Sequence, residues 1–509
     1  GSYVARRVPT TSHLATPGQS RAYSPTMAAR EPRRSHLLPR IGISLLGLAF
    51  LALASMDGIV AQEPYDIAII GGHVIDPETG LDAVRSIGIR GDLIAVVSEE
   101  GLDAATVIDA RGLVVAPGFI DILASPPRAD EGAVFKIFDG VTSVVSMHGG
   151  PVGTAEWYEE RGRSGSFHHY GTTVGHGPLR VAAGATDPYA AATPSQLDSM
   201  IEMARRALTE GAVGIGFGVA YVPGASRLEV LRLFELAAAE GVPCHLHIRH
   251  FGPVPPSNSS LDAVEEVIAA AAVTGASAQI VHIGSMVADP ADMAAALWMI
   301  EGARSRGIDV MADVYPYTAA STGLGTTTFD EGWQQRFGGI DYDDLELVSN
   351  GERLTAERFN TFRAQGGAPV VIHYIPEVTI RAALAHPLVM VASDGVIQNG
   401  RGHPRGAGTF ARVLGKYVRE SSVIELPEAI EKMTLMPALR LEASVDGMKR
   451  KGRLQRGSDA DIVVFDPETV GDRATFADPA QRSVGMRWVL VGGQVVISDG
   501  ELRDGARPG

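Results

Sequence analysis

Short apolar runs separated by turn residues fill two regions of the chain that lie far apart in the sequence. Residues 65–115 contain runs such as DIAIIGG, SIGIRGD and LIAVVSEEG, and the same texture returns in residues 452–502. Runs of about four to six residues that end at Gly, Asp or Asn are typical of antiparallel strands. Because each set alone is short for a stable sheet, we expect both chain ends to form one small, discontinuous β-sandwich.

The middle of the chain alternates apolar strand-like runs with helical patterns, which is typical of repeated βα units and a parallel sheet. Helical patterns cover, for example, residues 194–210, 228–241, 261–274 and 290–306. The strand-like runs between residues 113 and 395 are GLVVAPGFIDI, VTSVVSM, HYGTTVGHG, AVGIGFGVAY, PCHLHIR, AQIVHIG, DVMADVYPY and LVMVASDG. This repetition predicts an α/β fold built on a closed (β/α)₈ barrel, in which the chemistry sits at the C-terminal ends of the strands.

The N-terminal segment has the pattern of a signal peptide. An apolar run at 41–55, IGISLLGLAFLALAS, follows the basic stretch at 30–40. A membrane span needs about 20 such residues, whereas the core of a signal peptide needs about 7–15. We expect a mature chain that begins near Gln62 and is exported, periplasmic or secreted, with no stable membrane insertion; an uncleaved anchor is the alternative.

These patterns predict four segments along the chain. Residues 1–61 form an extension with the signal peptide, and residues 116–450 form the barrel domain that would carry the chemistry. The β-sandwich consists of an N-terminal segment, 62–115, and a C-terminal segment, 451–509.

Charge and cysteine content exclude several classes of partner and site. The chain carries 44 Lys and Arg against 59 Asp and Glu, a net charge of −15. An acidic chain without a basic face does not favour nucleic-acid binding. The single cysteine, Cys244, rules out an intramolecular disulfide and any zinc site built on two or four cysteines. A small-molecule substrate is the expected partner, and the oligomeric state is left open.

Polar residues at the ends of the predicted barrel strands are the candidates for chemistry. His247 closes PCHLHIR and His282 closes AQIVHIG, each inside an otherwise apolar run, and Asp394 follows the last strand. Neutral imidazoles on neighbouring strands can share a metal ion such as zinc. A carboxylate beside them can bind the metal, or move a proton from water to a leaving amine. A buried core histidine or a turn aspartate is the simpler alternative for each residue alone.

Further candidates sit at strand ends or in the loops that follow. These are His176 in VGHGPLR, Tyr315 in DVYPYT, and His403 with Arg405 in GHPRGAGTF. Tyrosine and arginine in such places commonly anchor a substrate oxyanion or carboxylate. A purely structural role is the alternative for each of the four.

Taken together, the ordered motifs resemble the amidohydrolase superfamily, specifically its N-acyl-D-amino-acid deacylase (D-aminoacylase) branch. The motifs that carry the resemblance are VAPGFID (115–121), GVTSVV (140–145), VGHGPLR (174–180), GVAYVPG (218–224), HIR (247–249), DVYPYTAASTGL (313–324), SDG (393–395) and HPRGAGTF (403–410). The resemblance implies a hydrolase of an amide C–N bond in a small N-acylated amino acid. In such enzymes a metal-activated water attacks the acyl carbonyl and an aspartate transfers its proton to the amine.

Carried over to this sequence, the resemblance makes His247 and His282 ligands of one zinc ion and Asp394 the catalytic acid and base. It also places Tyr221, Tyr315 and Ser321 where the family contacts its substrate. His176, His403 and Arg405 are additional candidates for substrate binding.

The sequence departs from the family pattern at three metal-ligand positions. The family places His-x-His after VAPGFID, and the matching positions here hold Leu123 and Ser125. Where the family has a cysteine ligand, this chain has Gly149, preceded by His148. A catalytic zinc normally has three protein ligands and a water. At most one metal is therefore expected, with His148 as a candidate replacement ligand after a small shift of the backbone.

These departures leave two alternatives beside a single-metal hydrolase. One is a metal-free protein that binds a small ligand in the same barrel without hydrolysing it. The other is a metal-independent enzyme that uses acid–base groups for a reaction such as lactone opening or isomerisation. The single-metal hypothesis requires His247, His282 and Asp394 to converge in space.

Overall fold

A computed structural model describes residues 64–124, 130–253, 258–503 and 505–509. All of them fall within one compact unit. The predicted signal peptide and extension (1–61) lie outside the described residues. Among the helices that the structure describes, none has the length and apolar character to cross a membrane.

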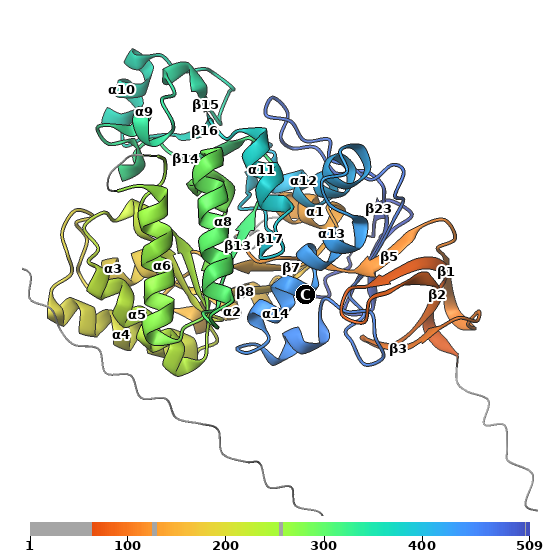
Figure 1. Ribbon diagram of the computed structural model, residues 1–509. Coiled ribbons are helices and arrows are strands. Elements are labelled where there is room, and N and C mark those ends of the chain that lie inside the picture. Colours follow the sequence, from red (N-terminus) through yellow and green to blue (C-terminus); the bar gives the residue numbers. More distant parts are fainter. Residues whose placement is uncertain (1–63, 125–129, 254–257, 504) are drawn as a thin grey trace, which may run out of the picture. The chain divides into compact units, whose positions relative to one another are not determined.

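The central domain is a parallel (β/α)₈ barrel, as the alternation of strands and helices predicts (Figure 1). Its first sheet runs β6-β7-β8 and its second runs β9-β10-β11-β12-β13-β17, all in parallel register. β8 and β9 are two pieces of one barrel strand separated by Thr173. The bounds are β6 (Phe119–Asp121), β7 (Val141–Ser146), β8 (His169–Thr172), β9 (Val174–Gly175), β10 (Ile215–Gly218), β11 (Cys244–His247), β12 (Ala278–Ile280), β13 (Val310–Val314) and β17 (Val389–Val391).

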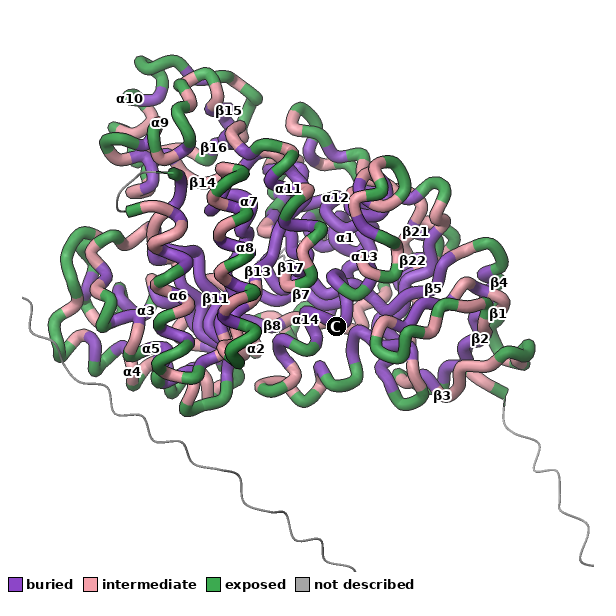
Figure 2. Tube along the Cα trace, in the orientation of Figure 1, coloured by how far each residue is buried: buried purple, intermediate pink, exposed green. Residues whose placement is uncertain are grey.

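The last strand meets the first through hydrogen bonds just beyond their ends. The Asp394 backbone N–H donates to the Leu123 carbonyl at 2.6 Å, and the Ser393 N–H donates to the Asp121 carboxylate at 3.0 Å. These bonds join the two edges of the barrel at its C-terminal end. The strand residues form the buried centre of the molecule (Figure 2).

Helices pack around the strands. Their bounds are α1 (Asp130–Phe138), α2 (Thr154–Gly162), α3 (His176–Ala182), α4 (Pro194–Thr209), α5 (Arg227–Glu240), α6 (Ser260–Thr274), α7 (Ile283–Met286), α8 (Pro290–Arg304), α11 (Glu377–Leu384), α12 (Arg405–Arg412), α13 (Leu426–Met433) and α14 (Leu435–Leu441). Local sequence sets several of these ends. Ser226 and Ser259 accept backbone N–H bonds at the starts of α5 and α6, and Gly241 and Gly275 end both helices in the left-handed conformation.

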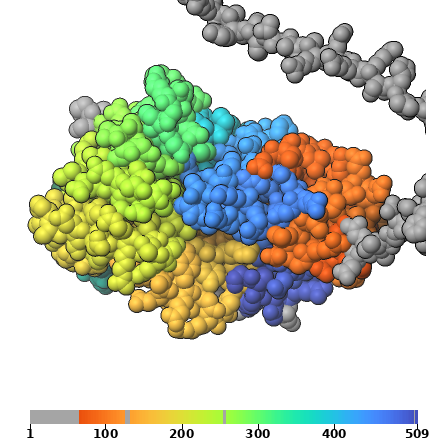
Figure 3. Space-filling view, turned by 90° about the horizontal axis from the view of Figure 1, so that it is seen from below, coloured from red at the N-terminus to blue at the C-terminus, as the bar shows by residue number. Residues whose placement is uncertain are grey.

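Strands from both ends of the chain share one sheet, in the order β23-β22-β21-β20-β5-β1-β2-β3, with β4 paired to β1. β5 and β20 join the two sets by antiparallel pairing, for example Val115 with Val464. Figure 3 shows the N-terminal strands beside C-terminal segments on one face. The bounds are β1 (Tyr65–Asp76), β2 (Leu81–Arg90), β3 (Leu93–Ser98), β4 (Ala104–Asp109), β5 (Val114–Pro117), β20 (Ile462–Phe465), β21 (Met486–Val491), β22 (Gln494–Ser498) and β23 (Glu501–Leu502).

An insert follows β13 and covers a portion of the barrel mouth. It contains the antiparallel sheet β14-β16-β15, with β14 at Ala319–Gly323, β15 at Leu345–Leu347 and β16 at Pro369–His373. Two short helices, α9 (Trp333–Arg336) and α10 (Ala356–Ala364), accompany it. Stacking of Trp333 on Phe359, with ring centroids 5.2 Å apart, helps give the insert an aromatic core of its own.

Candidate active site

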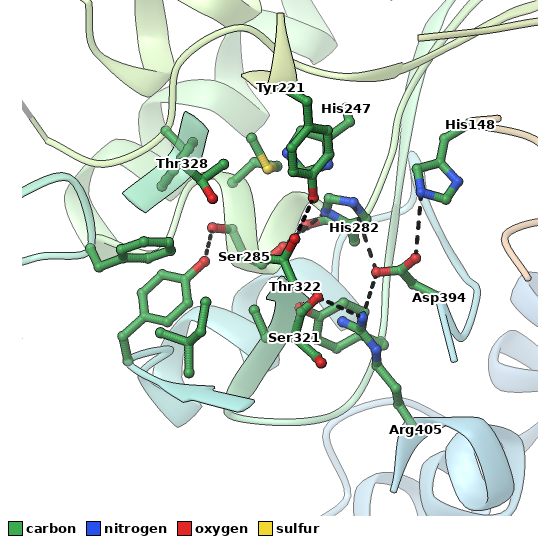
Figure 4. A pocket seen from close by; sticks show the side chains of 17 residues that line it. His148, Tyr221, His247, His282, Ser285, Ser321, Thr322, Thr328, Asp394 and Arg405 are labelled. Atoms are coloured by element: carbon green, nitrogen blue, oxygen red, sulfur yellow. Dashed lines mark hydrogen bonds and ion pairs between the residues drawn. The ribbon is translucent and has the colours of Figure 1, made fainter. Parts of the chain in front are cut away.

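The C-terminal ends of the barrel strands surround a cavity of about 110 Å³ (Figure 4). Eight of the residues singled out from the sequence line it: His148, Tyr221, His247, His282, Tyr315, Ser321, Asp394 and Arg405. These residues come from segments between positions 148 and 405 of the chain. The single-metal hypothesis requires His247, His282 and Asp394 to lie together, and all three line this cavity.

The backbone conformation at the end of each strand determines where the polar side chain there points. His247 is the last residue of β11, whereas His282 and Asp394 lie just beyond β12 and β17. Both His282 (φ 36°) and Asp394 (φ 51°) occupy the left-handed region. Non-glycine residues adopt this conformation rarely, and such strain is found most often at functional sites.

The two central histidines are held in the neutral form that binds metals. Their rings lie 4.8 Å apart, centroid to centroid, and burial lowers the pKa of both well below the usual value for histidine. His282 Nδ1 is hydrogen-bonded to Ser285 Oγ at 2.9 Å, and the same hydroxyl donates to the His282 carbonyl. His282 Nδ1–H therefore donates a hydrogen bond to the hydroxyl, and His282 Nε2 keeps a free lone pair.

The Asp394 carboxylate lies next to an arginine and two histidines in the cavity. Its Oδ2 lies 2.8 Å from Arg405 Nη2 and 3.9 Å from His282 Nε2, and its Oδ1 lies 3.8 Å from His148 Nε2. The Arg405 guanidinium also stacks over the Tyr315 ring at 4.5 Å. Burial raises the pKa of Tyr315 to about 12, so its phenol is a hydrogen-bond donor at neutral pH.

A buried ion pair beneath Asp394 supports the adjacent backbone, although no sequence motif indicates it. Lys136 Nζ on α1 lies 2.8 Å from Asp121 Oδ2 and 2.5 Å from Ser393 Oγ. Ser393 Oγ in turn donates to Asp121 at 2.6 Å. The side chains of Lys136 and Asp121 are 2% and 0% exposed. Nothing in the local pattern around Lys136 indicates which carboxylate it meets, because the partner lies 15 residues away on another element.

The opposite side of the cavity is built largely by the insert, from which sequence reasoning found Ser321 but missed Thr322, Thr328 and Tyr374. Tyr221 Oη is 3.2 Å from Thr322 Oγ1 on β14, and Tyr374 Oη donates to the Ser285 carbonyl at 2.5 Å. Thr328 lines the same side (Figure 4). Ser285 could have been found from the sequence, because a side chain one helical turn after His282 can reach its imidazole.

Two predicted substrate contacts, His176 and His403, lie outside the cavity lining. His176 is fully buried at the start of α3 and bonds to Glu229 at 2.7 Å, beside Arg180, whose nearer contact with that carboxylate is 2.6 Å. His403 Nε2 donates to the Ala319 carbonyl at 3.0 Å. Each imidazole is hydrogen-bonded within the protein, and local sequence does not reveal this, because both partners come from distant segments.

The donor chemistry of the cavity fits one divalent cation. As placed, no three His, Cys, Asp or Glu side chains in the described stretches of the chain form a finished metal site. Two neutral imidazoles and a carboxylate nevertheless face one cavity, and neither ring nitrogen of His247 bonds to another described residue. Leu123, where the resemblance expects a histidine ligand, is buried in an apolar cluster, and Ser125 lies outside the described residues.

Comparisons with known proteins agree with this geometry. The sequence profile described as "Amidohydrolase family" matches residues 171–497. The chain is 35% identical to an N-acyl-D-glutamate deacylase and 32% identical to a D-aminoacylase, both from Alcaligenes xylosoxydans xylosoxydans; each match covers 86% of this chain and 94% or 95% of the relative. The fold superimposes with a TM-score of 0.75, at 31% identity, on the crystal structure of an N-acyl-D-glutamate deacylase from Bordetella bronchiseptica complexed with zinc and a phosphonate inhibitor. That match covers 86% of this chain and 99% of the other.

Proposed function

We propose that this chain, which belongs to the amidohydrolase family, hydrolyses the amide bond of an N-acyl-D-amino acid with the help of one divalent metal ion. The observation that supports the proposal most is the convergence of His247, His282, Asp394 and Arg405 on one cavity at the barrel mouth. A binding protein without chemistry would have no physical need for two neutral imidazoles beside a carboxylate.

His247, His282 and Asp394 would hold the ion, and His148 stands next to Asp394 as a further donor. Zinc is the proposed identity, because these ligand types suit it and a relative of similar structure was crystallised with zinc. When bound, such an ion polarises a carbonyl group and lowers the pKa of water.

Asp394 would carry the proton in the reaction. Its carboxylate accepts a proton from water as the water oxygen attacks the amide carbon, and then delivers that proton to the nitrogen of the leaving amine. Arg405 lies 2.8 Å from this carboxylate and holds it in place, and Tyr221 offers its hydroxyl from the other side of the cavity. The products are a carboxylic acid and a free amino acid.

Arg405, Tyr315 and Ser321 would bind the α-carboxylate of the substrate. An arginine has five N–H donors, so the one paired with Asp394 leaves others for a second carboxylate. Arg405 is the only Lys or Arg among the described residues that line this cavity. The rest of the wall includes Phe251, Met286, Phe337 and Ile372. The proposed amino-acid portion therefore has an apolar side chain rather than an acidic one.

The test combines metal content with turnover. The wild-type protein, expressed from residue 62, should bind about one equivalent of zinc and hydrolyse N-acetyl-D-leucine or N-acetyl-D-methionine faster than N-acetyl-D-glutamate. His247→Ala should lose both the metal and the activity, and a chelator should abolish turnover in the wild type. Turnover that resists the chelator would instead support metal-free acid–base chemistry, and binding without turnover would support a non-catalytic protein.

Export to the periplasm or the medium is proposed from residues 41–55 alone. Expression of the full chain, followed by cell fractionation and N-terminal sequencing, tests it. A product that begins near Gln62 in the exported fraction supports cleavage, and a full-length product in the membrane fraction supports an anchor.

A further inference from the structure

A second cavity, of about 460 Å³, adjoins the proposed catalytic cavity. His148 lines both cavities. Gly395 and Gly406, which follow Asp394 and Arg405 in the chain, also line the second one. The two cavities therefore meet at the residues that would carry the chemistry, and the second has about four times the volume of the first.

The first cavity has little room beyond the amino-acid portion of a substrate. Its volume is about 110 Å³, and its lining consists of the proposed anchors for the α-carboxylate and the apolar residues of the wall. In Figure 4, His148 and Asp394 lie on one side of it, whereas Ser285 and Thr328 lie on the other. If the amino-acid portion of the substrate extends toward the insert, its acyl group lies on the side of His148 and Asp394. The second cavity begins on that side.

One part of the wall of the second cavity is apolar and has few side chains. Gly149, Gly150 and Pro151 form one side of it, and Val396 lies two residues after Asp394. A Cβ added at Gly149 would have no atom within 4 Å, so this glycine leaves open space next to His148. Val396 is 54% exposed although it is a large apolar residue. Such a wall favours a hydrocarbon group, because covering it removes apolar surface from water.

Of the charged side chains that line this cavity, Lys136 and Glu131 are hydrogen-bonded within the protein, and Arg161 stacks over the Trp157 ring at 4.6 Å. Lys136 Nζ is bonded to Asp121 and Ser393, and the Glu131 carboxylate accepts the backbone N–H groups of Asn399 and Gly400 at 2.9 and 2.6 Å. A second carboxylate on the acyl group would compete with these internal bonds. An uncharged acyl chain would leave them intact.

We propose that the second cavity binds the acyl portion of the substrate, and that the preferred substrates carry an apolar acyl chain of about eight carbons rather than an acetyl group. This inference rests on the proposed function, because it places the scissile carbonyl between the two cavities. The expected reaction adds water across the amide C–N bond and releases a medium-chain fatty acid and a free amino acid.

The experiment compares N-octanoyl and N-acetyl derivatives of the same D-amino acid. We expect kcat/KM to be at least about ten-fold higher for the octanoyl compound, since each buried methylene adds to binding. Val396→Trp narrows the cavity and should reduce that ratio about ten-fold. Val181→Trp is the matched control, because Val181 is an exposed valine on α3 that lines neither cavity, and it should keep the wild-type ratio.

Binding of free octanoate by calorimetry separates this inference from the proposed function. Octanoate should bind to the wild type and to Val181→Trp, and at least about ten-fold more weakly to Val396→Trp. If both substrates are hydrolysed with equal kcat/KM, or octanoate binds equally to all three proteins, the acyl-cavity proposal is wrong while the hydrolase stands. If octanoate binds as expected but no N-acyl amino acid is hydrolysed, the proposed function fails and the hydrocarbon site stands.

Discussion

The buried pair of Lys136 and Asp121 offers a direct test of how the barrel positions Asp394. Lys136→Met keeps the length and apolar stem of the side chain but removes the ammonium group. Asp121 would then be a fully buried carboxylate without its cation, next to Ser393, which immediately precedes Asp394. We expect a loss of stability and a loss of catalytic rate from the same change.

The expected size of the stability loss follows from the distance between the charges. At 2.8 Å, and with an effective dielectric constant of about 20, Coulomb attraction is worth about 6 kcal/mol. The lysine also loses its hydration in the native state, so the net effect of breaking a buried pair is smaller, about 3–5 kcal/mol. The hydrogen bonds that Ser393 still donates to Asp121 place the expectation toward the lower end of that range.

Urea unfolding at pH 7 measures this loss, and a double-mutant cycle with Asp121→Asn isolates the charge interaction. The double variant should recover some of the stability lost in Lys136→Met, since no charge is left unpaired. Lys449→Met is the control, because Lys449 pairs with Asp446 at the same 2.8 Å on the surface and should leave the urea midpoint unchanged. A cost below about 1 kcal/mol for Lys136→Met, or strict additivity in the cycle, would refute the reasoning.

Three further predictions concern the metal, acid stability and substrate binding. Gly149→Cys should raise zinc affinity at least about ten-fold in an equilibrium metal titration, because a thiolate adds a third strong ligand, and Gly149→Ser should not. Although burial opposes it, hydrogen bonds from His176 and Arg180 lower the pKa of Glu229 from 4.5 to about 2. Its ionised form therefore stabilises the fold above about pH 4.5, and this contribution is lost as the pH falls toward 2; Glu229→Gln should flatten the dependence of the urea midpoint on pH across that window. Arg405→Lys should raise KM about ten-fold or more in steady-state kinetics, since lysine cannot make a bidentate contact with a carboxylate; an unchanged KM would remove Arg405 from substrate binding.

The features of the fold that follow from local chemistry were predictable from the sequence. The apolar strand runs and the helices at 194–210 and 290–306 have close counterparts in β6–β17, α4 and α8. Strand period, helix caps and breaker residues act over a few positions, so they survive in the sequence as patterns. The pairing of the two chain ends in one sheet was also predictable, because neither set of short strands could bury its apolar face alone.

The candidate site was predictable to a smaller extent. His247, His282 and Asp394 follow buried strands, and a closed barrel brings such positions to one end. His148 could not be placed from the sequence because adjacent strand residues face opposite ways, and only the turn after β7 brings its ring to 3.8 Å from Asp394. His176 shows the opposite outcome: it matches a family motif, yet Glu229 and Arg180 hold it in the interior.

The order of residues alone was therefore enough to predict the barrel and the donor types at its strand ends, whereas the expected loss of metal ligands at Leu123, Ser125 and Gly149 rests on the family resemblance and stays a prediction. Which of these groups meet became clear only in three dimensions. The folded chain pairs Asp394 with Arg405, places Lys136 on Asp121, and opens a second cavity beside His148. The difference is one of range: strand and helix patterns arise from neighbours a few residues apart, whereas charge pairing, burial and cavity shape depend on side chains brought together from distant segments.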